Sequence, residues 1–124
     1  MGKISEIPEI MEKIVRKTLK KFPTCRIGLA GGETPKALYE ALAEKKLPWE
    51  KIEFIQIDER YVGREDEKNN FRMQNEALFK KTSPKEIIFF DTLVSPEESV
   101  KKMAETLKKL QKKRKPLFDI LILG

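Results

Sequence analysis

The stretch CRIGLAGGETPKALYE, residues 25–40, decides the fold. It begins with a short apolar run, turns at Gly31 and Gly32, and continues through Thr34 and Pro35 into a helical pattern. Glycines permit a tight turn, Thr is a good helix N-cap, and Pro is favoured at the first helical position. We therefore expect a strand, a glycine turn and a helix capped by Thr34, which is how an α/β fold begins.

The rest of the chain repeats this alternation. The apolar patterns predict strands at 25–30, 51–58, 86–91 and 118–123, and helices at 8–21, 35–46, 71–81 and 96–113. Asn69 or Asn70 is the expected N-cap of the third helix. The order α, β, α, β, α, β, α, β predicts an open Rossmann-like α/β fold, a parallel sheet with flanking helices.

The last predicted helix has the clearest start. Ser95, Pro96 and Glu98 supply an N-cap, a first-turn Pro and the Glu of a capping box. Its expected buried stripe consists of Val100, Met103, Leu107 and Leu110. The basic run KKLQKKRK, 108–115, lies in the same helix and has no interleaved aromatic residues, so we expect a solvated helix face and no nucleic-acid partner.

The composition limits the chemistry that this chain can perform. It has 124 residues, a net charge of +6, one Cys and no His. We expect Cys25 in the core, no metal site, and a general base, if one exists, from a carboxylate or lysine. The positive charge favours anionic partners. The absence of a membrane-span pattern or secretion signal predicts a cytoplasmic protein with no membrane partner.

Ligands of parallel α/β sheets bind at the carboxyl ends of the strands, where GGETP, DERYVG and DTLVS lie in this sequence. Backbone N–H groups at the start of the helix after GGETP would suit a phosphate, although the same residues also make an ordinary turn. Asp58 could accept from a sugar hydroxyl or act as a base, and Arg60 could bind a carboxylate or phosphate with two hydrogen bonds. Alternatively, these charges only pair with neighbours.

Residues 29–79, LAGGETPKALYEALAEKKLPWEKIEFIQIDERYVGREDEKNNFRMQNEALF, closely resemble the 6-phosphogluconolactonases. That family has a GGSTP-like loop, a helix with LYE, an LPW segment, a DERYV strand end and an SNY or SNF turn. The final FDILILG resembles the strand that leads into the family's DGHTASLFP-type motif. The resemblance implies hydrolysis of 6-phosphogluconolactone to 6-phosphogluconate in the pentose phosphate pathway, without a cofactor.

The resemblance also implies which residues bind the substrate. The matching positions are Gly31, Gly32, Thr34, Asp58, Arg60 and Asn70. Two positions depart from the family pattern. Glu33 replaces a small hydroxyl residue and would put a carboxylate beside a phosphate, and Gly63 stands where Pro is common.

The family's catalytic His belongs to the DGH motif, which would lie beyond Gly124. Residues 1–124 are therefore expected to form a partial α/β domain, the N-terminal half of a lactonase, with no catalytic residue and no efficient activity alone. Strand 118–123 would then be an exposed edge, open to self-association or to a complementary fragment.

Two alternative functions remain open. The chain could be a noncatalytic phosphosugar-binding or interaction module. It could also resemble the glucosamine-6-phosphate isomerases and deaminases, which share the fold and the glycine loop. Their second strand typically ends in DEYVG, whereas Arg60 precedes Tyr61 here, and this favours the lactonase.

Overall fold

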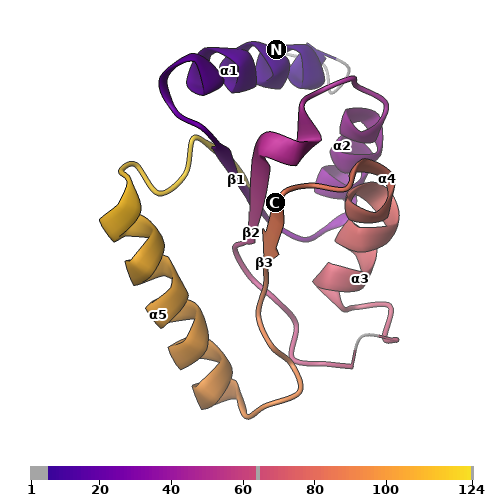
Figure 1. Cartoon of the computed structure of the whole chain (residues 1–124). Coiled ribbons are helices and arrows are strands. Elements are labelled where there is room, and N and C mark those ends of the chain that lie inside the picture. The colour runs from indigo at the N-terminus through magenta and orange to yellow at the C-terminus, as the bar shows by residue number, and fades with distance from the viewer. Residues whose placement is uncertain (1–5, 64, 124) are drawn as a thin grey trace.

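The structure is a computed structural model that describes residues 6–63 and 65–123. A four-stranded sheet with the order β3-β2-β1-β4 lies at its centre (Figure 1). The strands are β1 (Cys25–Leu29), β2 (Ile52–Gln56), β3 (Glu86–Ile88) and β4 (Ile120–Ile122), and every pairing is parallel. The predicted open parallel sheet is confirmed.

The helices connect these strands in the predicted order. They are α1 (Ile7–Lys21), α2 (Glu33–Ala43), α5 (Pro96–Lys113), and the short 3₁₀ turn η2 (Trp49–Lys51). Between β2 and β3 the chain forms α3 (Asn70–Gln74), the π-helical turn η3 (Asn75–Phe79) and α4 (Lys80–Thr82). Among the described helices, none is long and apolar enough to cross a membrane.

Helices cover both faces of the sheet. α1, α2 and the α3–α4 segment lie on one side, and α5 lies on the other (Figure 1). Successive side chains of β2 point to opposite faces of the sheet. Phe54 packs toward α2 and η3, and Ile55 packs toward Met103 and Leu110 of α5. As expected, Cys25 is buried in the larger core, where burial raises the pKa of its thiol to about 12.

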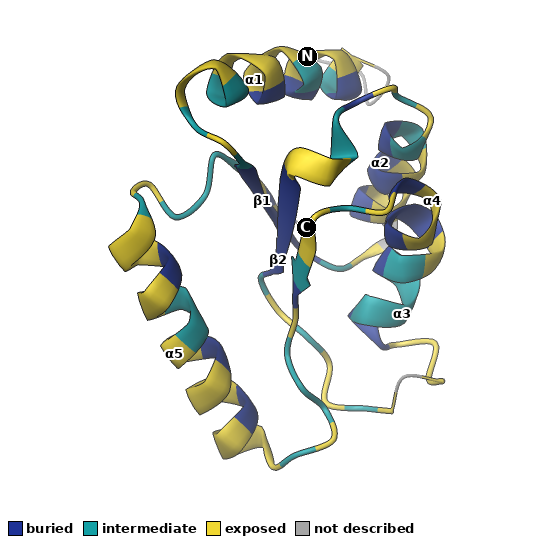
Figure 2. Ribbon diagram, in the orientation of Figure 1, coloured by how far each residue is buried: buried dark blue, intermediate teal, exposed yellow. Residues whose placement is uncertain are grey.

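The boundaries of α5 match the sequence prediction because its signals are local. The hydroxyl of Ser95 accepts a hydrogen bond from the backbone N–H of Glu98 at 3.2 Å. Met103 and Leu110 are buried, but the prediction for Val100 was wrong, since it is 60% exposed. Ser99, one helical turn before Met103, is buried in place of Val100. Figure 2 shows that the buried side of α5 is turned toward the sheet.

Replacing Ser95 with alanine should lower the free energy of unfolding by about 1 kcal/mol, because a first-turn N–H of α5 loses its cap. Urea denaturation measures the loss. Thr106→Ala, in the middle of the same helix, is the control and should be neutral or slightly stabilising, since Ala has the higher helix propensity. An equal loss in both variants would contradict the capping role.

Charged side chains meet at the amino-terminal ends of β1 and β2. Arg26 and Glu53 are register partners on the two strands, and Nε of Arg26 lies 3.5 Å from Oε1 of Glu53. Asp119 accepts two hydrogen bonds from the Arg114 guanidinium, at 3.0 and 2.6 Å, and one from the backbone N–H of Arg26 at 2.8 Å. Hydrogen bonding to Asp119 raises the pKa of Arg114. This cluster ties the end of α5 to the sheet.

Candidate functional site

The two motifs that follow β1 and β2 lie side by side, because these strands are neighbours in the sheet. A cleft of about 220 Å³ opens at their carboxyl ends. Its lining includes Gly32, Arg60, Glu67, Lys68, Asn70 and Met73. The structure therefore brings together three of the residues that the sequence indicated for substrate binding: Gly32, Arg60 and Asn70.

Asn70 is held in place from two sides and is 8% exposed. Its Nδ2 donates to the backbone carbonyl of Asp58 at 3.2 Å and lies 3.4 Å from Oδ1 of the same residue. On the other side it packs directly on Gly31, where a Cβ would overlap the amide of Asn70. The absence of a side chain at Gly31 is thus what admits Asn70.

Gly32, the residue just before helix α2, is its N-cap and has φ +114°, a backbone conformation that L side chains rarely adopt. The predicted N-cap was wrong, since α2 begins at Glu33 and Thr34 already lies in its first turn. Thr34 lines a separate apolar groove beside β4 and not the cleft of Arg60 and Asn70. The side chain of Glu33 lies outside the described residues.

Glu59 organises the site, and the sequence reasoning missed it. Its carboxylate accepts from the backbone N–H groups of Asn70 at 2.6 Å and Phe71 at 2.9 Å, at the start of α3. It also accepts from the N–H of Arg60 at 2.7 Å and from Nε2 of Gln56 at 2.9 Å. A carboxylate is favourable at a helix N-terminus. Its helix partners are 11 and 12 residues away, so no local pattern reveals the role.

Below the cleft, two buried glutamines join the ends of three strands. Gln56 donates to Oε1 of Gln74 at 3.2 Å and accepts from the N–H of Phe90 at 2.9 Å. Nε2 of Gln74 and the hydroxyl of Tyr39 both donate to the carbonyl of Ala30, at 3.4 and 2.5 Å. Burial raises the pKa of Tyr39 and keeps its hydroxyl protonated. Satisfied buried amides of this kind make a rigid floor.

Asp58 contacts Asn70 but does not line the Arg60 cleft. It lines a neighbouring cleft of about 290 Å³ together with Tyr61 and with Thr92 of the DTLVS segment. Among the described residues that line it, the Arg60 cleft has two cations, Arg60 and Lys68, and one carboxylate, Glu67. Amide and guanidinium donors with a net positive charge suit an anionic, hydroxyl-rich ligand. Among the described residues, no cluster of acidic or Cys side chains could hold a metal ion.

Sequence and structure comparisons agree about the relatives of this chain. The 6-phosphogluconolactonase of Thermotoga maritima is 36% identical over 98% of this chain and 52% of its own length. A crystal structure of 6-phosphogluconolactonase from that organism superposes with a TM-score of 0.87 and 32% identity, covering 100% of this chain and 56% of its own.

A 6-phosphogluconolactonase from Plasmodium vivax gives a TM-score of 0.80 at 30% identity, over 98% of this chain and 44% of its own. The chain spans about half the length of the curated relatives it matches. The family described as glucosamine-6-phosphate isomerases/6-phosphogluconolactonase matches residues 4–124. With its parallel sheet and its motifs in the order of that family, the chain belongs to the glucosamine-6-phosphate isomerase/6-phosphogluconolactonase family.

Proposed function

We propose that this chain carries the phosphosugar-binding part of a 6-phosphogluconolactonase, which hydrolyses 6-phosphogluconolactone to 6-phosphogluconate. The observation that carries the proposal is the convergence of Gly32, Arg60 and Asn70 on one cleft at the carboxyl ends of β1 and β2. The names of its relatives favour the lactonase over the isomerase branch of the family.

Each residue has a role in this proposal. The Arg60 guanidinium binds the phosphate or carboxylate of the ligand with two parallel hydrogen bonds. The amide of Asn70 binds a sugar hydroxyl, and Asp58 binds a second hydroxyl where the ligand extends into the neighbouring cleft. The positive φ of Gly32 lets the backbone at the start of α2 approach an anion. Gly31 supports this arrangement by giving space to Asn70, whereas Thr34, in the first turn of α2, lines a separate groove and has no direct part in it.

The hydrolytic step needs a water molecule that loses a proton as it adds to the lactone carbonyl, after which the ring C–O bond breaks. The sequence contains no His, the usual general base near neutral pH. We therefore propose that residues 1–124 bind the phosphosugar but turn the lactone over inefficiently. Neither binding of the phosphosugar nor hydrolysis of the lactone requires a cofactor in this proposal. The pentose phosphate pathway and the cytoplasm remain the predicted setting.

Binding of 6-phosphogluconate to the purified chain, measured by titration calorimetry, tests the proposal. Arg60→Ala should weaken binding about 10- to 100-fold, the range for losing a charge-assisted hydrogen-bonded pair. The matched control is Arg16→Ala, because Arg16 is an exposed arginine of α1 that pairs with Glu12. It should leave the affinity unchanged.

Three results would count against the proposal. If no binding is measurable, or if Arg60→Ala and Arg16→Ala weaken the affinity equally, the cleft does not bind 6-phosphogluconate as proposed. Tighter binding of glucosamine 6-phosphate than of 6-phosphogluconate would favour the isomerase branch. Lactone hydrolysis by the 124-residue chain at the rate of the Thermotoga maritima enzyme would refute the inferred lack of turnover.

We further propose that strand 118–123 is a partner surface, used for self-association or for a complementary fragment. The position of β4 at one edge of the four described strands supports this, as do the exposed side chains of Leu121 and Leu123. Neither a membrane nor a nucleic acid is part of the proposed partner set.

A further inference from the structure

Gln56, the last residue of β2, makes hydrogen bonds to three separate parts of the chain. Its Oε1 accepts from the backbone N–H of Phe90, two residues beyond the end of β3, at 2.9 Å. Its Nε2 donates to Oε2 of Glu59 at 2.9 Å and to Oε1 of Gln74 in α3 at 3.2 Å. Gln56 is 4% exposed, so each partner that the amide lost would leave a polar group buried without compensation.

The direction of these hydrogen bonds is fixed by backbone groups at both ends. The N–H of Phe90 only donates, so the side-chain oxygen of Gln56 faces it and the NH₂ group faces the other way. The carbonyl of Ala30 only accepts, so Gln74 turns its own NH₂ group toward that carbonyl, at 3.4 Å. Oε1 of Gln74 is thereby left to accept from Gln56. A buried network with one consistent direction is rigid, because each hydrogen bond supports the next.

Both branches of this network end at the Arg60 cleft. One ends at Glu59, whose carboxylate accepts from the backbone N–H groups of Arg60 and Asn70. The other ends at the carbonyl of Ala30, directly before the glycine pair 31–32. Gln56 therefore connects the two walls of the cleft, although it is not among the described residues that line it.

We infer that Gln56 is a positioning residue for the phosphosugar: its amide fixes Arg60 and the glycine loop relative to each other, and so raises the affinity of the cleft. The inference rests on the proposed binding of 6-phosphogluconate there. A glutamine that only filled space would behave differently, because replacing its NH₂ group with an oxygen atom would leave the affinity unchanged.

The substitution Gln56→Glu keeps the size and shape of the side chain and changes its hydrogen bonding. When protonated, the new carboxyl group still donates one hydrogen bond. When ionised, it donates none and repels the carboxylate of Glu59, the titratable side chain to which Gln56 is hydrogen-bonded. Burial and that carboxylate both raise the pKa of the new group, so its ionised fraction increases with pH and the affinity falls.

Titration calorimetry at two pH values measures this effect. At pH 8 we expect 6-phosphogluconate to bind Gln56→Glu at least about fivefold more weakly than the unmodified chain, and at pH 5 we expect a smaller difference. Comparison at equal pH removes the titration of the ligand itself. Tyr39, at the other end of the network, stays protonated at both pH values because burial raises its pKa.

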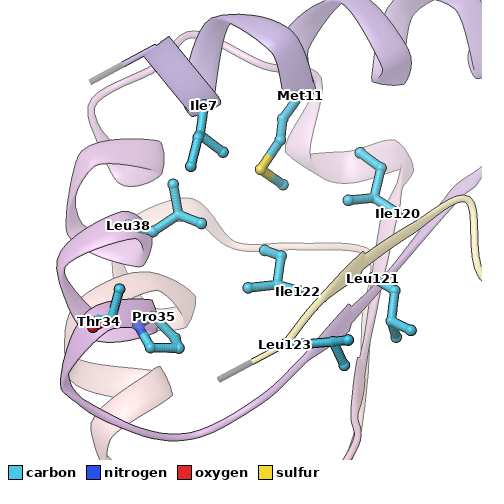
Figure 3. A pocket seen from close by; sticks show the side chains of 9 residues that line it. All are labelled: Ile7, Met11, Thr34, Pro35, Leu38, Ile120, Leu121, Ile122 and Leu123. Carbon is cyan, nitrogen blue, oxygen red and sulfur yellow. The ribbon is translucent and has the colours of Figure 1, made fainter. Parts of the chain in front are cut away.

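Two control variants separate this effect from added charge and from lost stability. Gln111→Glu makes the same substitution at an exposed position of α5. Met11→Ala removes a buried side chain from the apolar groove beside β4 (Figure 3), which none of the network residues named above lines. Both variants should leave the affinity unchanged, although Met11→Ala should lower the melting temperature.

Hydrogen exchange in the free chain gives a second readout, which needs no ligand. The amides of Asn70 and Phe71 donate to Glu59. Their protection should fall at least about fivefold in Gln56→Glu at pH 8, while that of Met103 in α5 stays unchanged. An affinity ratio that is the same at pH 5 and pH 8, or an equal loss of protection at Met103, would overturn the inference. If the unmodified chain does not bind 6-phosphogluconate, the proposed function fails, and the exchange measurement still decides whether Gln56 positions Glu59.

Discussion

Replacing Asp119 with alanine is expected to lower the free energy of unfolding by about 3–5 kcal/mol, the usual cost of removing one partner of a buried ion pair. The side chains of Arg114 and Asp119 are only 10% and 7% exposed. Without the carboxylate, the Arg114 guanidinium loses two hydrogen bonds and the N–H of Arg26 loses its acceptor. The end of α5 would then be held to β1 mainly by the Arg26 guanidinium, which donates to the carbonyls of Leu110 and Arg114.

Urea denaturation measures this loss, and Glu12→Ala is the matched control. Glu12 also pairs with an arginine, Arg16, at 2.9 Å, but that pair is exposed and should be worth less than about 1 kcal/mol. Labelling of Cys25 gives a second readout, because the thiol is buried beside this cluster with its pKa raised to about 12. Asp119→Ala should speed labelling at pH 8. Equal stability losses in the two variants would contradict a role for burial.

The Gly31→Ala substitution is expected to disturb the residues of the cleft more than an added methyl group at any other position near it. The new Cβ of Gly31→Ala would overlap the side-chain amide of Asn70. Asn70 is fixed by its hydrogen bonds to Asp58 and Glu59 and cannot yield cheaply. We expect a loss of about 1–3 kcal/mol in stability from overpacking, and 6-phosphogluconate affinity at least about tenfold lower.

Two variants isolate the cause of that effect. Gly63→Ala is the matched control, because the atoms nearest to its Cβ belong to the exposed side chain of Glu65, which can move. Asn70→Ala combined with Gly31→Ala should recover the stability lost through the overlap, although not the ligand affinity. If the double variant were as unstable as the sum of the two single variants, the proposed contact would be wrong.

The sequence predicted features that depend on local signals. Ser95, Pro96 and Glu98 place the start of α5 correctly, and Asn69 caps α3 as expected by accepting from the N–H of Arg72 at 2.8 Å. The first helix and the first two strands also lie where the hydrophobic pattern predicts them. These elements owe their position to neighbours within about four residues.

Features that depend on distant contacts were missed or misplaced. The sequence pattern of 71–81 suits one continuous helix, and it gives no sign of the π-helical turn at Asn75–Phe79. Glu59 looks like one of three charged residues at a strand end, and only the fold brings it to the start of α3. Val100 fits an apolar stripe by spacing, but the inward direction of α5 is set by how it packs on the sheet.

The pair of Arg26 and Glu53 has a consequence for how the chain selects one alignment of its strands. Both side chains face the α5 side of the sheet, beside Ile55, while Ile27 and Phe54 face the larger core. A shift of either strand by one residue would turn its charge into that apolar core without a partner, which is costly. Alternative registers are thereby penalised even where their backbone hydrogen bonds would be equally good, and the native alignment is singled out during folding.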